Sequence, residues 1–291
     1  HQQHFIADGK NDSPITSNHL LDMIADRNDG VWISTEFGGV AHIQVLEKNT
    51  ERVFPDNNRR MDFSNTVRMI SKSKNGDILV ATRAGWLYRY SSDMKQMKGK
   101  SHYDSNVYAI KEARDGQTWI GTRGKGIYGV DGLDFGNHNV FCMAEDNKNR
   151  MWVGTYGDGL SAVMKRGQKY IIKRLFRDSV GTNEVRCIIK DRKGWIWVGT
   201  TGGLLVFNPD KFIFDKNAYI QYLTGKEIHD IFVDSKNRIW LAIPEEGICV
   251  TTNKNGYNRL KFKCYNRLNG LVNDMTQCVV EDRKGDYWIS T

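Results

Sequence analysis

A short motif recurs seven times along the chain and constrains the fold more than any other feature. Its clearest copy is Met151-Trp152-Val153-Gly154-Thr155, and successive copies lie between 33 residues (119 to 152) and 48 residues (240 to 288) apart. A repeat of this length predicts an array of small units that stack on one another. The seven anchor positions are Trp32, Leu79, Trp119, Trp152, Trp197, Trp240 and Trp288.

Each repeat contains segments that read as four β-strands. A run of β-branched residues such as 185–189 comes first, a polar turn and the anchor stretch follow, and a glycine turn leads to a third apolar run such as 203–207. The fourth strand is the least regular, as in residues 170–175 and 260–265. Short strands separated by turn residues are typical of all-β folds. Four strands repeated about seven times predict an all-β β-propeller.

The pattern is incomplete in two places. Residues 131–139 contain no clear fourth strand, so we expect the third blade to have a minimal outer strand. The chain ends at Thr291, directly after the second strand of repeat seven. We therefore expect residues 1–291 to form a single propeller that is truncated inside its seventh blade, with residues 4–9 supplying a fourth strand to that blade.

Three positions in each repeat have a predicted role in the scaffold. An Asp stands six residues before five of the anchors, and we expect it to cap its own turn. A calcium loop is not indicated, because the ligand spacing and the closing Glu are missing. The residue two after the anchor is small, which lets neighbouring sheets interdigitate, and a Thr that usually follows it is expected to satisfy backbone groups. The five Asp residues are Asp26, Asp146, Asp191, Asp234 and Asp282.

The charge and the cysteines of the chain argue against several kinds of partner and site. The net charge of +8 favours acidic partners, but no Lys/Arg-rich block concentrates it, so a nucleic-acid partner is not expected. Five cysteines without a CxxC pair indicate neither a disulfide framework nor a zinc site. Cys142, Cys187 and Cys278 occupy the same repeat position, ten before an anchor, and are expected to be small buried residues. No run of 18 apolar residues occurs, so nothing in the sequence is expected to span a membrane. The sequence contains no signal peptide but opens at His1 without Met, so export stays undecided.

No motif for catalysis is present. The sequence lacks GxSxG, HExxH, a phosphate-binding loop and a set of His residues at metal-ligand spacing. Glu245 and Glu246 form an acidic pair, but residues adjacent in sequence rarely face one substrate together. We therefore expect no catalytic residue, no metal and no cofactor.

Two positions vary in type while their neighbours hold to the pattern: eleven residues before the anchor and four residues after it. Both should lie at one rim of a propeller, where a regular scaffold presents variable binding residues. Arginines there could bind carboxylates or sulfates in a bidentate manner, and Tyr108, Tyr156 and Trp86 could stack on sugar rings. The alternative is that the rim is a solvated surface or packs on another domain. The candidate ligand-binding residues are Arg68, Arg83, Tyr108, Arg123, Tyr156, Arg186 and His229.

Residues 185–204 read Val-x-x-Ile-x-x-Asp-x-x-Gly-x-Ile-Trp-Val-Gly-Thr-x-x-Gly-Leu, and this pattern resembles the two-component regulator propeller repeat. The lead-in to repeat seven, residues 267–275, is also similar to that family's linker. The resemblance implies the extracytoplasmic sensor of a Bacteroides-type hybrid two-component system. In that family, two seven-bladed propellers and an immunoglobulin-like sandwich precede a membrane helix and a histidine kinase.

For this chain, the resemblance implies one propeller of the sensing half, in the periplasmic part of an inner-membrane protein. It implies an oligosaccharide ligand, acidic ones included, and control of polysaccharide-utilisation genes. Further propeller and sandwich domains of the same polypeptide and a homodimeric receptor are the expected partners. The chain itself is not expected to be an enzyme, although the full-length protein would be a histidine kinase.

Two rival functions use the same architecture. The first is a carbohydrate-active propeller enzyme such as a polysaccharide lyase. The second is a protein-interaction scaffold of the WD-repeat kind, and the absence of that family's Gly-His and Trp-Asp pairs counts against it. Fold alone does not decide among the three.

Overall fold

The computed structural model describes residues 5–7, 15–26, 30–44, 50–56, 62–176, 181–253 and 256–291. Its regular structure is β except for two single turns, the α-helix α1 (Pro209–Phe212) and the 3₁₀ helix η1 (Arg267–Asn269). No helix in the described ranges is both long and apolar enough to cross a membrane. The chain divides into two compact units, one of residues 1–107 and 280–290 and the other of residues 108–279 with residue 291.

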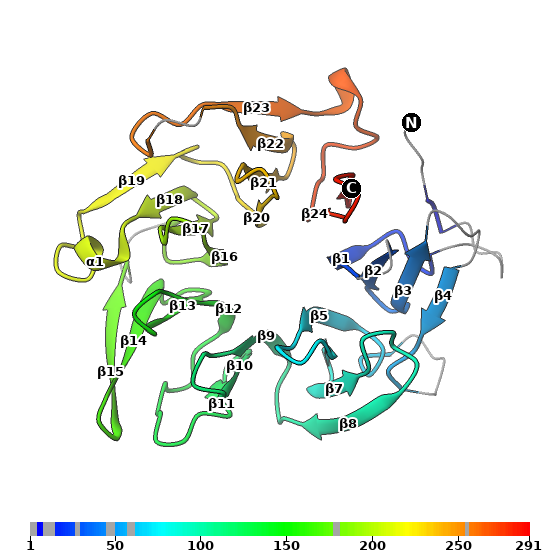
Figure 1. Ribbon diagram of the computed structural model, residues 1–291, viewed down its shortest axis with the longest axis horizontal. Helices are drawn as coiled ribbons and strands as arrows, with labels where there is room; N and C mark the ends of the chain where they lie inside the picture. Colours follow the sequence, from blue (N-terminus) through cyan, green and yellow to red (C-terminus); the bar gives the residue numbers. More distant parts are fainter. Residues whose placement is uncertain are drawn as a thin grey trace. The chain divides into compact units, whose positions relative to one another are not determined.

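The first unit contains two four-stranded antiparallel sheets whose strands follow chain order (Figure 1). The first strands of these sheets, β1 and β5, are neighbours. One sheet consists of β1 (Leu20–Ala25), β2 (Gly30–Thr35), β3 (Gly39–Gln44) and β4 (Thr50–Val53), and the other of β5 (Val67–Lys72), β6 (Ile78–Thr82), β7 (Trp86–Tyr90) and β8 (Met97–His102).

The second unit begins with a three-stranded sheet and continues with three four-stranded ones. The first strands of the latter are side by side, β12 next to β16 and β16 next to β20 (Figure 1). The sheets are β9 (Val107–Glu112), β10 (Thr118–Thr122) and β11 (Gly126–Tyr128); β12 (Val140–Glu145), β13 (Met151–Thr155), β14 (Leu160–Arg166) and β15 (Lys169–Leu175); β16 (Val185–Lys190), β17 (Ile196–Thr200), β18 (Gly203–Phe207) and β19 (Tyr219–Tyr222); and β20 (Asp230–Val233), β21 (Ile239–Ile243), β22 (Gly247–Thr251) and β23 (Phe262–Tyr265).

The chain is thus an all-β β-propeller, as predicted, but not one of seven four-stranded blades. The described residues form six sheets of three or four strands and a final pair, β24 (Val279–Glu281) and β25 (Tyr287–Ile289). The missing outer strand in residues 131–139 and the incomplete last blade are both confirmed. The fourth strand predicted over residues 4–9 is not found in its described part, residues 5–7, although the Phe5 ring lies 6.2 Å from that of Trp288. The other residues of that segment lie outside the described ranges.

A hydrogen-bonded Asp–Trp pair organises four of the repeats. One carboxylate oxygen of Asp191 accepts the backbone N–H groups of Lys193 and Trp195, both at 2.9 Å, so the predicted turn cap is confirmed. The other oxygen accepts the indole N–H of Trp197 at 3.0 Å, a contact that the sequence did not suggest. This geometry recurs, because the indole groups of Trp152, Trp240 and Trp288 each donate to the Asp six residues earlier at 2.9 Å. The carboxylate therefore ties the turn to the largest buried side chain of the sheet.

The repeats that lack this pair show what it supplies. Ala113 stands at the Asp position of the third repeat, and the buried indole N–H of Trp119 has no hydrogen-bond partner among the described residues. In the first repeat, Asp26 accepts from Nε2 of His42 at 2.5 Å instead, and the Trp32 indole N–H is likewise unpaired within the described ranges. An unpaired buried donor costs about 1–3 kcal/mol.

Small residues after the anchor allow successive sheets of the second unit to approach each other. A Cβ on Gly154 would lie 2.4 Å from the side chain of Val185, in the next sheet, and 2.5 Å from the sulfur of Cys142. At Gly199 the same atom would lie 2.4 Å from the Cys187 sulfur. Neither distance leaves room for a methyl group, so the predicted interdigitation of large and small residues is confirmed.

The structure contains a disulfide, which the analysis of cysteine spacing missed. Cys249 on β22 and Cys264 on β23 are paired residues of adjacent antiparallel strands, and their sulfurs are bonded. Neither occupies the repeat position of the three other cysteines, which are free. The pairing depends on strand register, which the spacing of five cysteines does not give. Cys278 is buried as predicted, whereas Cys142 and Cys187 are only half-buried. Desolvation nevertheless raises the pKa of both of these thiols above the usual range.

Ala113→Asp is expected to stabilise the protein by about 1 kcal/mol, because the new carboxylate would accept the Trp119 indole N–H. Chemical denaturation measures the change. The control is the same substitution in a Trp119→Phe background, which has no indole N–H. An equal gain in that background would contradict the assigned pairing.

Removal of the disulfide by Cys249→Ala with Cys264→Ala is expected to lower the free energy of unfolding by about 3 kcal/mol, because the bond closes a loop of 15 residues. Thiol alkylation of the unfolded, unreduced protein should modify the three free cysteines and leave two protected. Modification of all five would show that the bond is absent.

Candidate functional site

Backbone hydrogen bonds place the variable positions of each repeat at one end of its sheet, the rim. The N–H of the residue four after the anchor donates to the carbonyl of the residue thirteen before it. Arg83 donates in this way to Thr66 at 2.8 Å, and Tyr156 to Asn139 at 3.0 Å. The same bond joins Glu36 to His19 and Thr201 to Glu184. The start of the first strand and the turn between the second and third strands are therefore adjacent, as predicted.

A β-bulge sets the direction of the other variable side chain. In four sheets the pairing of the first and second strands skips the residue eleven before the anchor; for example, Val140 pairs with Thr155 and Cys142 with Gly154, which leaves Phe141 unpaired in the register. The skipped residues in the other three sheets are Leu21, Arg68 and Arg186. A bulge turns its side chain out of the regular alternation, a device often found beside binding sites.

In the second unit, these positions assemble into one continuous group of side chains, the rim cluster. The rings of Tyr108 and Phe141 are stacked with centroids 4.5 Å apart, and those of Phe141 and Tyr156 with centroids 5.4 Å apart. The guanidinium of Arg186 lies over the Tyr156 ring, 5.2 Å from its centre. Three aromatic rings and a cation from successive sheets thus form a single stack.

The rim cluster continues as a row of polar side chains. Nη2 of Arg186 lies 2.6 Å from a carboxylate oxygen of Glu227, and Nε2 of His229 lies 3.1 Å from the same oxygen. The other ring nitrogen of His229 lies 2.8 Å from the amide oxygen of Gln277. The cluster therefore contains Tyr108, Phe141, Tyr156, Arg186, Glu227, His229 and Gln277.

The stack changes the role that the sequence suggested for its tyrosines. Phe141 and Arg186 both pack against Tyr156, so less of the face of that ring is open to a sugar. The phenol groups of the tyrosines are hydrogen-bond donors and acceptors, so they offer a second mode of contact with a sugar. Trp86, in the first unit, is similarly covered, since the Lys100 ammonium lies 5.0 Å over its ring and His102 lies 4.6 Å away.

The first unit holds a second group, the arginine cluster. Arg68 and Arg83 each have a guanidinium nitrogen 4.0 Å from the same Glu36 oxygen. The Arg83 guanidinium also lies 4.3 Å from the centre of the Phe63 ring, which is exposed. Two cations around one carboxylate leave a net positive charge that suits an acidic ligand.

The structure therefore brings together six of the seven predicted residues in two groups. Arg68 and Arg83 form the arginine cluster, and Tyr108, Tyr156, Arg186 and His229 belong to the rim cluster. Arg123 lies exposed in the turn between β10 and β11, and none of the contacts described above involves it. Whether any of the seven binds a ligand stays a prediction.

Glu227 and Phe63 are the members that sequence reasoning did not consider. Glu227 stands thirteen residues before its anchor, at the position whose carbonyl bonds to the turn in other sheets. That position varies as much as the two rim positions and would have been found by extending the comparison by two residues. Phe63 precedes a first strand in a segment without repeat character, so no signal marks it.

A half-buried carboxylate, that of Asp230, lies beside the rim cluster. Asp230 follows His229 in the chain, and its side chain accepts the backbone N–H of Val279 at 3.3 Å. Asp22 makes the same contact to Ile70 in the first unit. Desolvation by burial raises the pKa of Asp230 to about 6, and the hydrogen bonds from Val279 and Ile231 oppose that rise.

Stability is expected to depend on pH through Asp230. Its folded pKa lies above the usual value of 3.8, so the folded chain binds this proton more tightly than the unfolded chain. The stabilisation is fully present below pH 3.8 and is lost as the pH rises through 6. Relative to Asp230→Asn, which keeps an acceptor for the Val279 N–H, the unsubstituted protein should become less stable between pH 4 and pH 7. Denaturation at both pH values measures this, and a constant difference would contradict it.

Comparison with known protein families supports the assignment of the repeats. Residues 104–124, 134–157 and 172–202 match the family described as "two component regulator propeller", which confirms the resemblance of the repeats. No curated protein sequence matches the chain.

Three solved structures illustrate the similarity of fold. The extracellular domain of a protein described as a hybrid two component system from B. thetaiotaomicron has 20% sequence identity and a TM-score of 0.74 over 100% of this chain and 41% of its own. Virginiamycin B lyase from Staphylococcus aureus has 12% identity and a TM-score of 0.72 over 100% and 95%. PorZ, a surface component of the type-IX secretion system of Porphyromonas gingivalis, has 15% identity and a TM-score of 0.72 over 96% and 46%. The chain thus spans about two fifths of the Bacteroides protein, and likeness at these identities establishes the β-propeller fold alone.

Proposed function

We propose that this chain, whose repeats match the two-component regulator propeller family, is a ligand-sensing domain of a hybrid two-component receptor and is not itself an enzyme. The observation that carries the proposal is the rim cluster. Side chains from successive sheets vary in type yet meet in one row on a scaffold that repeats almost unchanged. A variable row on a constant scaffold suits recognition of one ligand.

The chemistry of the rim favours an oligosaccharide, and an acidic one in particular. Tyr108 and Tyr156 offer phenol groups and Gln277 an amide, which match sugar hydroxyls. Arg186 and, in the other unit, Arg68 and Arg83 supply guanidinium groups that bind carboxylates or sulfates. In this proposal the ligand comes from a complex glycan, and the receptor controls genes for the use of that polysaccharide.

The disulfide supports an extracytoplasmic location, because such bonds persist in oxidising compartments. We place the chain in the periplasmic part of an inner-membrane protein, as a single propeller joined to further propeller and sandwich domains. The receptor would act as a homodimer whose populations of active and inactive states shift when ligand binds. No metal or cofactor enters this scheme.

The proposal is tested by incubating the protein with acidic oligosaccharides released from polysaccharides. We expect a rise in melting temperature without turnover, since a ligand that binds only the folded state stabilises it. A new product in the mixture would contradict the sensor function.

Arg186→Gln is expected to weaken any detected binding by about 10- to 100-fold, because it removes a charged partner of the ligand. Isothermal titration calorimetry measures the affinity. The control is Arg166→Gln, which removes an exposed arginine at the end of β14, away from the rim cluster. Equal affinity of both variants and the unsubstituted protein would remove Arg186 from the site.

A polysaccharide lyase is the alternative, and one observation favours considering it. The similarity to virginiamycin B lyase covers 95% of that enzyme, so this architecture supports elimination chemistry elsewhere. The described residues contain no group of three or more His, Cys, Asp or Glu side chains suited to a metal ion. The product assay above separates the two functions.

A further inference from the structure

A cavity of about 300 Å³ lies between the last two complete sheets of the second unit. Its walls come from the turn between β16 and β17, the turn between β20 and β21, and the connection from β22 to β23. These segments stand at the end of the strands opposite to the rim. The cavity is therefore separate from the rim cluster, and its volume matches one or two sugar rings.

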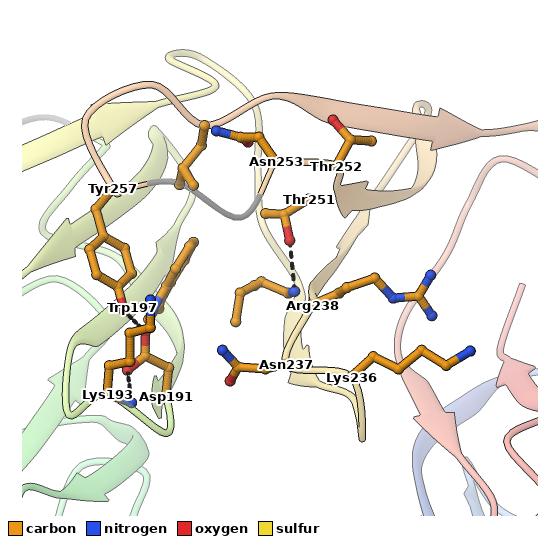
Figure 2. A pocket seen from close by; sticks show the side chains of 13 residues that line it. Asp191, Lys193, Trp197, Lys236, Asn237, Arg238, Thr251, Thr252, Asn253 and Tyr257 are labelled. Atoms are coloured by element: carbon orange, nitrogen blue, oxygen red, sulfur yellow. Dashed lines mark hydrogen bonds between the residues drawn. The ribbon is translucent and has the colours of Figure 1, made fainter.

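Figure 2 shows two facing walls in this cavity. Asp191, Lys193, Trp197 and Tyr257 form one wall, and the Asn237 side chain points toward them from the other. Ile239, Thr251 and Leu260 complete the lining with apolar and hydroxyl groups. Lys236 and Arg238 line the outer part, and their charged ends extend away from Tyr257 in the same view.

The one carboxylate in the lining is fully occupied. Asp191 accepts two backbone N–H groups, the Trp197 indole at 3.0 Å and the Tyr257 hydroxyl at 2.7 Å. Burial, and next the neighbouring Asp191, raises the pKa of Tyr257, so its phenol stays neutral and keeps donating. With its four hydrogen bonds, Asp191 has little capacity left for a ligand. Its negative charge offsets one cation of the lining, and Arg238 is paired with Asp234 at 2.6 Å, so Lys193 and Lys236 leave the cavity a net positive charge.

Two groups retain hydrogen-bonding capacity toward the cavity. The side-chain amide of Asn237 has no hydrogen-bond partner among the described residues. The backbone of Asn237 has φ 59°, a conformation that Asn tolerates and that sets the direction in which the side chain leaves the backbone. The Lys193 ammonium lies 5.9 Å from the centre of the Tyr257 ring, a distance at which it can still donate to a ligand. An amide and an ammonium beside the apolar groups of Ile239 and Leu260 suit a molecule with hydroxyls, a carboxylate and a C–H surface.

We propose that this cavity is a second binding site and takes an acidic monosaccharide or a terminal acidic sugar residue. Lys193 pairs with the carboxylate, Asn237 bonds to the ring hydroxyls, and Ile239 and Leu260 contact the C–H groups. An inorganic anion has no C–H groups to contact the apolar wall. A neutral sugar has no charge to pair with the cations. The site is independent of the rim cluster, so it stands whether or not the rim binds a ligand.

The test measures binding of D-glucuronate and D-galacturonate by calorimetry and by ligand-observed NMR, with D-glucose and inorganic phosphate as comparison ligands. At least one of the two acids should bind with a dissociation constant of about 1 mM, as expected for a ligand of this size. Lys193→Gln and Asn237→Gly should each weaken it about 10-fold; glycine tolerates the backbone conformation at position 237, and Lys193 is exposed, so neither change should disturb folding.

Two matched variants separate this site from the rest of the chain. Lys169→Gln removes an exposed lysine on β15 and should leave binding of the acid unchanged, whereas Arg186→Gln, in the rim cluster, shows whether the acid binds at the rim. The proposal is overturned if neither acid binds, if glucose or phosphate binds equally well, or if Arg186→Gln abolishes binding while Lys193→Gln does not. The last result would place the acid at the rim and support the function proposed above without the second site.

Discussion

The structure depends on one repeated interaction, the bond between a turn aspartate and the indole of a tryptophan six residues later. A buried indole N–H needs an acceptor, and a carboxylate that leaves water needs several donors. The turn backbone and the indole supply those donors together, as at Asp146, where one oxygen accepts from Lys148 and Arg150 and the other from Trp152. Each sheet that contains the pair thereby fixes its first hairpin and its core at the same point.

Most of the fold could be predicted from the sequence, because the residues that build it repeat, whereas much of the candidate site could not. The Asp, the Trp, the small residue and the Thr depend on contacts within a repeat or with the next one, so their recurrence reveals their role. The Thr155 hydroxyl, for example, donates to the Gly159 carbonyl at 2.8 Å, as expected from its place at the end of the second strand. The absence of a fourth strand in the third sheet could be predicted for the same reason, since residues 131–139 break the pattern.

The site depends instead on contacts between side chains of different repeats, which no single repeat records. The sequence located the variable positions but not that Tyr108, Phe141 and Tyr156 would cover one another's faces. Glu227 was not predicted, because its role depends on its contacts with Arg186 and His229, which belong to different repeats. The Cys249–Cys264 bond was missed because it depends on the register of two strands. The bonds to the turn backbone and to the indole give the physical reason for the recurring Asp.

Two ends of the same strands therefore carry different kinds of chemistry. The rim presents ring edges, guanidinium groups and amides in a continuous row, whereas the opposite end encloses a cavity with cationic surroundings. The Asp–Trp pairs hold the turns at the cavity end, and the rim lies at the other end of the same strands. A change in the scaffold should consequently alter stability before it alters recognition.

A double-mutant cycle on Asp146 and Trp152 tests this account most directly. Unfolding free energies are measured for the unsubstituted protein, Asp146→Ala, Trp152→Phe and the double variant. If the carboxylate and the indole are coupled, the two single losses should exceed the loss in the double variant by about 1–2 kcal/mol. Losses that simply add would show that the pair does not hold the repeat together.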